Sequence, residues 1–179
     1  LIKKAKECGA EVWFLRPTEF ATDEASKLPV IRHALLQAEQ HYSRKFDVLV
    51  DLDATSPLRL VKDISYALNQ FINDDADILI TASPCRKNPY FNLVEINSNG
   101  YLKLSKELKK KIVRRQDCPK VYEHVANAYI FKPEFIIKKK YLMAGKLIGH
   151  EIKNFMSWDI DNKFDFKIAE YLLKLKKYV

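Results

Sequence analysis

Two pairs of aspartates with i, i+2 spacing offer the clearest chemistry in this sequence. Asp51 and Asp53 directly follow an apolar run, and Asp159 and Asp161 directly precede a helical pattern. Because side chains alternate along a strand, the first pair points to one side of a strand end, where open α/β sheets bind ligands. The second pair offers the oxygen ligands that Mg²⁺ prefers. Asp159 and Asp161 are therefore candidate metal ligands.

Both pairs also have a purely structural explanation. After the first pair, Ser56 or Asp63 could cap the helix that is predicted to follow. After the second, Asp161 or Asn162 could cap the last predicted helix. An isolated Asp-x-Asp does not separate metal binding from capping, since aspartate is common at helix starts.

Other polar residues could bind an anionic or sugar substrate. Arg16 follows a short predicted strand and could fork onto a phosphate, although a surface arginine with Asp23 as a helix cap explains the same residues. Arg115 could pair with a substrate carboxylate, and Asn127 could both donate to and accept from sugar hydroxyls. For His124, which lacks a placed partner, the structural interpretation is preferred.

The elements that must position these residues alternate between strand and helix, which favours a parallel sheet covered by helices. Apolar spacing predicts helices over residues 1–8, 25–42, 61–71 and 162–178, and strands over 11–15, 46–52, 77–82, 90–96 and 121–131. Residues 46–82 form a predicted βαβ crossover, whose first strand is apolar enough for burial on both faces. Between Pro84 and Ile152 the alternation changes, so we expect an excursion from the main sheet.

Length and composition are those of a single globular domain. The chain has 179 residues, 47% of them hydrophobic, and a formal charge of +8. Nucleic-acid binding is disfavoured, because no aromatic residues are interleaved with the lysine clusters, and a solvated lysine-rich surface explains the charge. No apolar run approaches the roughly 18 residues that a membrane span needs. We expect a cytoplasmic protein without a membrane partner, whose three scattered cysteines form no disulfide framework or zinc site.

Taken in order, these segments resemble the acylneuraminate cytidylyltransferase family, also called CMP-sialic acid synthetases. The similarity covers nearly the whole chain and rests on four stretches: Arg16-Pro17 with Ala21 and Asp23; Val30-Ile31-x-His33-Ala34-Leu35; Ala54-Thr55-Ser56-Pro57-Leu58-Arg59; and Asp159-Ile160-Asp161 with Asp165, Ala169 and Glu170.

The resemblance implies a Rossmann-like nucleotidyltransferase, a three-layer α/β/α domain with a mainly parallel sheet. In this family a nine-carbon 2-keto sugar acid attacks the α-phosphorus of CTP and expels pyrophosphate, with Mg²⁺ neutralising charge. It also implies a homodimer, with residues 84–152 as the dimerisation arm. The implied roles are metal binding and catalysis for Asp159 and Asp161; nucleotide binding for Arg16, Asp23 and Ser26; and sugar binding for Asp53, Thr55, Ser56, Arg115, Asn127 and Tyr129.

The sequence departs from the family pattern in three ways. The family's phosphate-binding loop would precede Leu1, so we expect the chain to be N-terminally truncated. We also expect it to have little activity on its own. Asp53 stands where many sialic acid enzymes have glutamine, which suggests a bacterial legionaminic-type sugar. Ala126-Asn127-Ala128-Tyr129 matches the family's Asn-Gly-Ala stretch only loosely. A CMP-Kdo synthetase, a non-catalytic dimerising remnant and a nucleic-acid-binding protein stay as alternatives.

Overall fold

The computed structural model describes residues 2–22, 24–110 and 112–175. A four-stranded sheet lies at its centre, with the strand order β1-β5-β2-β6. Its strands are β1 (Leu49–Asp51), β2 (Ile78–Pro84), β5 (Tyr122–Phe131) and β6 (Leu147–Glu151). The strand β5 runs antiparallel to both neighbours, β1 and β2, whereas β2 and β6 are parallel. Three of the four strands therefore share one direction, as the predicted mainly parallel sheet requires.

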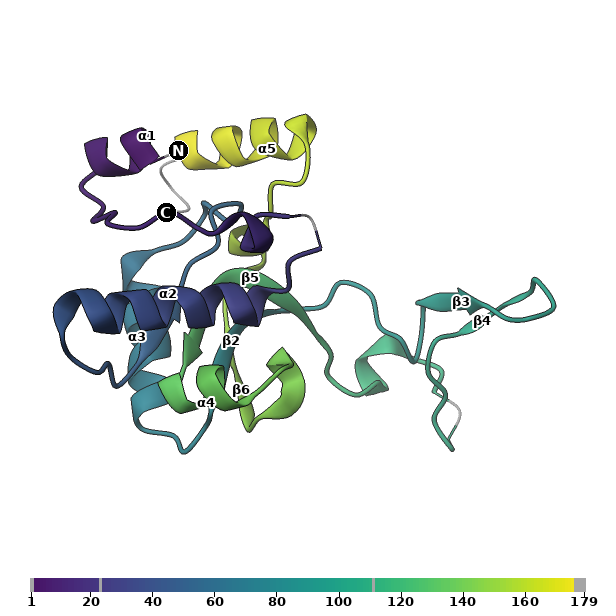
Figure 1. Cartoon of the computed structure of the whole chain (residues 1–179). Coiled ribbons are helices and arrows are strands. Elements are labelled where there is room, and N and C mark those ends of the chain that lie inside the picture. Colours follow the sequence, from purple (N-terminus) through teal and green to yellow (C-terminus); the bar gives the residue numbers. More distant parts are fainter. Residues whose placement is uncertain (1, 23, 111, 176–179) are drawn as a thin grey trace.

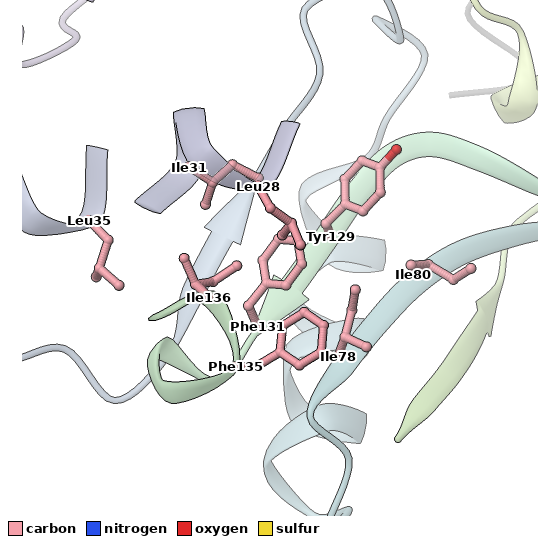
Figure 2. Packing of buried hydrophobic residues seen from close by; sticks show 9 residues of the cluster. All are labelled: Leu28, Ile31, Leu35, Ile78, Ile80, Tyr129, Phe131, Phe135 and Ile136. Atoms are coloured by element: carbon pink, nitrogen blue, oxygen red, sulfur yellow. The ribbon is translucent and has the colours of Figure 1, made fainter. Parts of the chain in front are cut away.

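Helices cover both faces of this sheet (Figure 1). On one face, α2 (Lys27–Tyr42) and α4 (Pro133–Lys138) pack against β2 and β5, and on the other lies α3 (Val61–Ile72). Figure 2 shows the first of these cores, in which the rings of Phe131 and Phe135 stack at 6.2 Å between centroids. Leu79 and Ile130 point to the opposite face and pack on Ala67 and Phe71 of α3. The three-layer α/β/α prediction is confirmed.

The strand predicted over residues 11–15 is absent from the described part of the chain, and β1 is shorter than the predicted 46–52. Both differences have one physical cause, because a strand needs a hydrogen-bonded partner and β1 pairs on one side only, with β5. Beside β1 lies an apolar groove whose lining includes Trp13, Phe14, Ala34, Ala38, Phe46 and Val50. Val50 is accordingly 38% exposed, so the prediction that this strand is buried on both faces is wrong.

Residues 85–121 leave the sheet and project to the right of the body in Figure 1. They contain the hairpin of β3 (Val94–Ile96) and β4 (Leu102–Leu104) and the short helix η2 (Arg115–Asp117). Every residue of both hairpin strands is exposed. The excursion is shorter than the expected 84–152, because β5 and β6 belong to the central sheet.

The chain closes with η4 (Asn154–Ser157) and α5 (Lys163–Lys174). The remaining elements are α1 (Ile2–Glu7), η1 (Thr18–Phe20) and η3 (Leu142–Ala144). In the described residues, none of the helices has the length and apolar character that crossing a bilayer demands.

Candidate active site

The first aspartate pair lies at the carboxyl end of β1. Asp51 is the last residue of that strand, and Lys27, the first residue of α2, reaches across to it. The Lys27 Nζ lies 2.9 Å from Asp51 Oδ2 and 2.6 Å from Asp53 Oδ2, so one ammonium bridges both carboxylates. The prediction that Asp51 and Asp53 face the same side is confirmed.

An aromatic pair forms one side of this cluster. Tyr129 on β5 stands opposite Asp51 in the β1–β5 ladder, and the Lys27 Nζ lies 3.7 Å from the centre of its ring. The edge of the His124 ring meets Tyr129 at 5.2 Å between centroids. In Figure 2 the Tyr129 hydroxyl points away from the packed core, toward the loops above the sheet. The phenol therefore has its ring in the core and its polar end at the site.

Electrostatics fix the charge states in this cluster. Burial alone would lower the pKa of Lys27, but its hydrogen bonds to Asp53 and Asp51 outweigh burial and raise that pKa above its usual value. Burial raises the pKa of the Tyr129 phenol. Desolvation of the ring, together with the nearby Lys27 charge, lowers the pKa of His124. At neutral pH the cluster holds an ammonium cation, a neutral phenol and a neutral imidazole.

Arg59 holds the loop that carries Asp53 in place. Its guanidinium donates to the carbonyl of Asp53 and, through Nε at 2.9 Å, to that of Ser56. Ser56 lies beneath the loop with no exposed surface, and its Oγ has no hydrogen-bond partner among the described residues. Thr55 is exposed on the loop. The capping alternative for Ser56 and Asp63 is wrong, because the residue before α3 is Leu60 and no side chain caps the helix.

The second aspartate pair lines a separate acidic cleft of about 610 Å³. Glu123 and Asp165 lie in the same lining, together with the cation Arg86 and the ring of Trp158. The buried indole Nε1 of Trp158 has no hydrogen-bond partner within the described ranges. Buried polar atoms without partners are rare and often mark places where a ligand or water binds.

Capping does not occupy the Asp161 carboxylate. Asn162 caps α5, where its Oδ1 accepts from the amide of Phe164 at 2.8 Å, and Asp165 completes the capping box. The Asp159 Oδ1 accepts from the amide of Ile160 at 3.0 Å, and no hydrogen bond within the described residues falls on its second oxygen. Over the described residues, no group of three or more His, Cys, Asp or Glu side chains is close enough to enclose a metal. Two carboxylates completed by substrate phosphates are a donor set that suits Mg²⁺.

The two aspartate pairs belong to adjoining loops. The amide of Ile160 donates to the carbonyl of Thr55 at 2.9 Å, which ties the loop after β1 to the segment before α5. Behind this bond, Val125, Ile152 and Met156 pack into a small core. Both pairs therefore lie at the same edge of the sheet, where a substrate that bridges them can be held.

The other predicted site residues do not form one cluster with the two aspartate pairs. Arg16 and Ser26 are exposed, and Ser26 precedes α2 without a side-chain capping bond, while Asp23 lies outside the described residues. Arg115 donates to the carbonyl of Arg86 at the base of the projecting segment. Asn127 is buried, and its Nδ2 donates to the carbonyl of Met156 at 3.4 Å, so it joins β5 to η4.

Sequence reasoning missed Lys27. One local signal was present, since a lysine in the first turn of a helix opposes the helix dipole and calls for a compensating partner. The identity of that partner could not be predicted, because Asp51 on β1, Asp53 in the loop after it and Tyr129 on β5 come from other parts of the chain.

Comparison with known proteins identifies the family. The chain is 41% identical over 177 residues to post-translational flagellin modification protein B of Campylobacter coli, covering 98% of this chain and 74% of that protein. It is 43% identical over 173 residues to the CMP-N,N'-diacetyllegionaminic acid synthase of Campylobacter jejuni, covering 96% and 72%. The chain belongs to the acylneuraminate cytidylyltransferase family.

More distant members and the fold agree with this assignment. An N-acylneuraminate cytidylyltransferase of Streptococcus agalactiae is 24% identical over 152 residues, which are 85% of this chain and 35% of that one. A scan against models of protein families finds no match. Among solved structures, a CMP:2-keto-3-deoxy-manno-octonic acid synthetase complexed with CTP has a TM-score of 0.57 at 11% identity, covering 86% of this chain and 70% of that one. The 4-diphosphocytidyl-2C-methyl-D-erythritol synthase of Anaerococcus prevotii has a TM-score of 0.50 at 10% identity, covering 80% and 66%.

At these low identities the solved structures establish the fold alone. For this cytidylyltransferase family member the fold is that of the nucleotidyltransferases, as the sequence predicted.

Proposed function

We propose that the protein transfers CMP from CTP to a nonulosonic acid and releases pyrophosphate. The observation that carries this proposal is the bond between Ile160 and Thr55, which brings two carboxylate pairs to one edge of a nucleotidyltransferase sheet. The relatives at 41% and 43% identity, one of them named as a CMP-N,N'-diacetyllegionaminic acid synthase, support the same activity. Because CTP is a substrate, the cytoplasm is the expected compartment.

In this reaction a hydroxyl of the sugar acid attacks the α-phosphorus of CTP, and the bond to pyrophosphate breaks. The protein acts mainly by positioning the two substrates and by neutralising charge. Asp159 and Asp161 would hold Mg²⁺, which would neutralise the charge on the phosphates. Asp53 and Thr55, on the adjoining loop, would contact the sugar acid.

We further propose that the preferred sugar is legionaminic-type rather than N-acetylneuraminic acid. An ionised Asp53 accepts hydrogen bonds but cannot donate them, so it suits a different pattern of substituents than a glutamine would. The higher identity to the legionaminic acid synthase than to the N-acylneuraminate enzyme supports this choice.

A homodimer built on the segment 85–121 is the third element of the proposal. This segment exposes several large apolar side chains, which favour association when they are contiguous. Among them are Val94 (50% exposed), Ile96 (73%), Tyr101 (72%), Leu102 (67%) and Val113 (78%). Sedimentation analysis of the wild type and of Ile96→Glu tests it: the wild type is expected to sediment as a dimer and the variant as a monomer, whereas a monomeric wild type contradicts the proposal.

The activity is tested by CTP-dependent pyrophosphate release with Mg²⁺, measured on the full-length gene product. The sugar acids should include legionaminic, N-acetylneuraminic and eight-carbon 2-keto acids. We expect release with a nine-carbon acid, and a loss of at least about 100-fold in Asp159→Asn and Asp161→Asn. The matched control is Asp74→Asn, since Asp74 is exposed in the turn that precedes the amino end of β2, far from the carboxyl ends of the strands. A folded protein that releases no pyrophosphate with any sugar acid would refute the proposal.

A further inference from the structure

Lys27 occupies an unusual place for a lysine. It is the first residue of α2, where the positive end of the helix dipole disfavours a cation, and its side chain is only 32% exposed. A lysine in the first turn of a surface helix would ordinarily extend into water. Here its ammonium turns inward to the end of β1, so the site and not the helix determines its position.

The Lys27 ammonium has three close neighbours. Two are the carboxylates of Asp51 and Asp53, at 2.9 and 2.6 Å, and the third is the face of the Tyr129 ring at 3.7 Å. Two carboxylates and an aromatic ring already surround the ammonium, so little room remains for a direct bond to a substrate anion. Lys27 is therefore better suited to orient its neighbours than to bind substrate itself.

Asp53 is the neighbour with capacity to spare. Lys27 engages its Oδ2, and Arg59 engages its backbone carbonyl. None of the contacts in the described part of the chain falls on Oδ1, and the side chain is 37% exposed. The Asp53 carboxylate is thus held through one oxygen, and the other is left able to accept a hydrogen bond but not to donate one.

We propose that Lys27 is a positioning residue for the sugar-acid site, which holds the Asp53 carboxylate oriented so that its Oδ1 accepts a hydrogen bond from an uncharged hydroxyl or amide N–H of the sugar acid. This inference rests on the proposed function, which places the sugar acid at Asp53. It defines a selectivity: the site favours a substituent that presents a donor and disfavours one that presents only acceptors or a negative charge.

The test separates the sugar acid from CTP in steady-state kinetics of pyrophosphate release. Lys27→Met keeps the length of the side chain and removes its charge, and Asp53→Asn removes the fixed acceptor. We expect each to raise KM for the sugar acid about tenfold or more and to leave KM for CTP within about twofold. The double variant is expected to be no worse than the worse single variant, because the two residues act as a unit. Lys27→Arg is expected to restore part of the loss.

A second measurement addresses the selectivity itself. The wild type is expected to use a sugar acid with a donor at the recognised substituent at least about tenfold better, in kcat/KM, than its deoxy analogue. Lys27→Met and Asp53→Asn should lose this preference. A merely structural role for Lys27 would lower stability without altering the ratio between two sugars. The control is Lys138→Met, since Lys138 forms an exposed pair with Glu134 on α4.

Each outcome is decisive. If the wild type is active and Lys27→Met leaves both KM for the sugar acid and the donor preference unchanged, the inference is overturned while the proposed function stands. If the folded wild type releases no pyrophosphate with any sugar acid, both are overturned. Should Lys27→Met fail to unfold cooperatively, Lys27→Arg and Asp53→Asn decide: a change confined to the sugar acid supports the inference, and none overturns it.

Discussion

The hydroxyl of Thr81 accepts a hydrogen bond from the amide of Ala128 at 2.9 Å, at the point where the β2–β5 register shifts. The same hydroxyl donates to the carbonyl of Val125 at 2.7 Å. Up to Ile80 the strands pair in one register, and from Thr81 onward in another, so residues 126–128 bulge out of the ladder. The bulge points Asn127 toward η4, where its side chain joins β5 to η4.

Thr81→Val should therefore destabilise the protein although it keeps the shape of the side chain. The substitution leaves the buried amide of Ala128 without an acceptor, which costs about 1–3 kcal/mol. Thr81→Ser keeps the hydroxyl and should lose less. Urea denaturation of the three proteins measures the difference, and equal stability of the valine variant and the wild type would contradict this account of the bulge.

Gly145 and Gly149 provide a matched pair for testing the core around Phe135. A Cβ on Gly145 would lie 2.4 Å from Cε2 of the buried Phe135 ring, whereas a Cβ on Gly149 meets its nearest atom, the Ala82 Cβ, at 3.9 Å. The Phe135 ring is buried and stacks on Phe131, so it cannot turn out into solvent without breaking this core. We expect Gly145→Ala to cost about 1–3 kcal/mol in the free energy of unfolding, and Gly149→Ala well under 1 kcal/mol. Thermal and urea unfolding of both variants measure this, and equal effects would show that the ring can yield.

The elements that the sequence predicts best are those with a strong local pattern. The helix predicted over 61–71 and the strand predicted over 121–131 each agree with the structure within one residue, α3 being Val61–Ile72 and β5 Tyr122–Phe131. The strand prediction is wrong for residues 11–15 and 46–48, because strand formation depends on a pairing partner and not on composition alone. The position of β5 as an antiparallel strand between β1 and β2 could not be predicted either, since the local sequence does not determine which strands pair.

In the candidate site, too, local features were predictable and contacts between distant segments were not. The spacing of Asp51 and Asp53 predicted that both face one side, which is confirmed by their shared contact with Lys27. The burial of Ser56 and the contact between Ile160 and Thr55 depend on how distant segments pack, so sequence could not supply them.

Arg59→Lys should loosen the loop that carries Asp53. The guanidinium donates from two nitrogens to the carbonyls of Asp53 and Ser56, and a single ammonium cannot reproduce this fork. We expect a loss of about 1 kcal/mol in stability and a higher KM for the sugar acid. Urea denaturation and pyrophosphate-release kinetics provide the two readouts. The control is Arg114→Lys, because Arg114 makes an exposed pair with Asp117 on the projecting segment; an unaltered KM in Arg59→Lys would show that the loop keeps its shape without the fork.

His150 should make the stability of the protein depend on pH between about 7.5 and 5.5. Its Nδ1 lies 2.8 Å from Gln70 Oε1, and burial lowers the pKa of the imidazole against the opposing field of Asp63. In the unfolded chain a histidine has a pKa of about 6.5, so as the pH falls through that value the unfolded state takes up the proton before the folded state does. Stability is therefore fully present above pH 6.5 and falls below it.

His150→Gln removes this titrating group and should lose less stability than the wild type between pH 7.5 and 5.5. Urea denaturation at several pH values gives the two slopes directly. His124, whose pKa is lowered in the same direction, is present in both proteins and contributes equally to both slopes. Identical slopes for the wild type and His150→Gln would mean that His150 takes up its proton as readily in the folded protein as in the unfolded chain, and that its burial beside Gln70 has no effect on protonation.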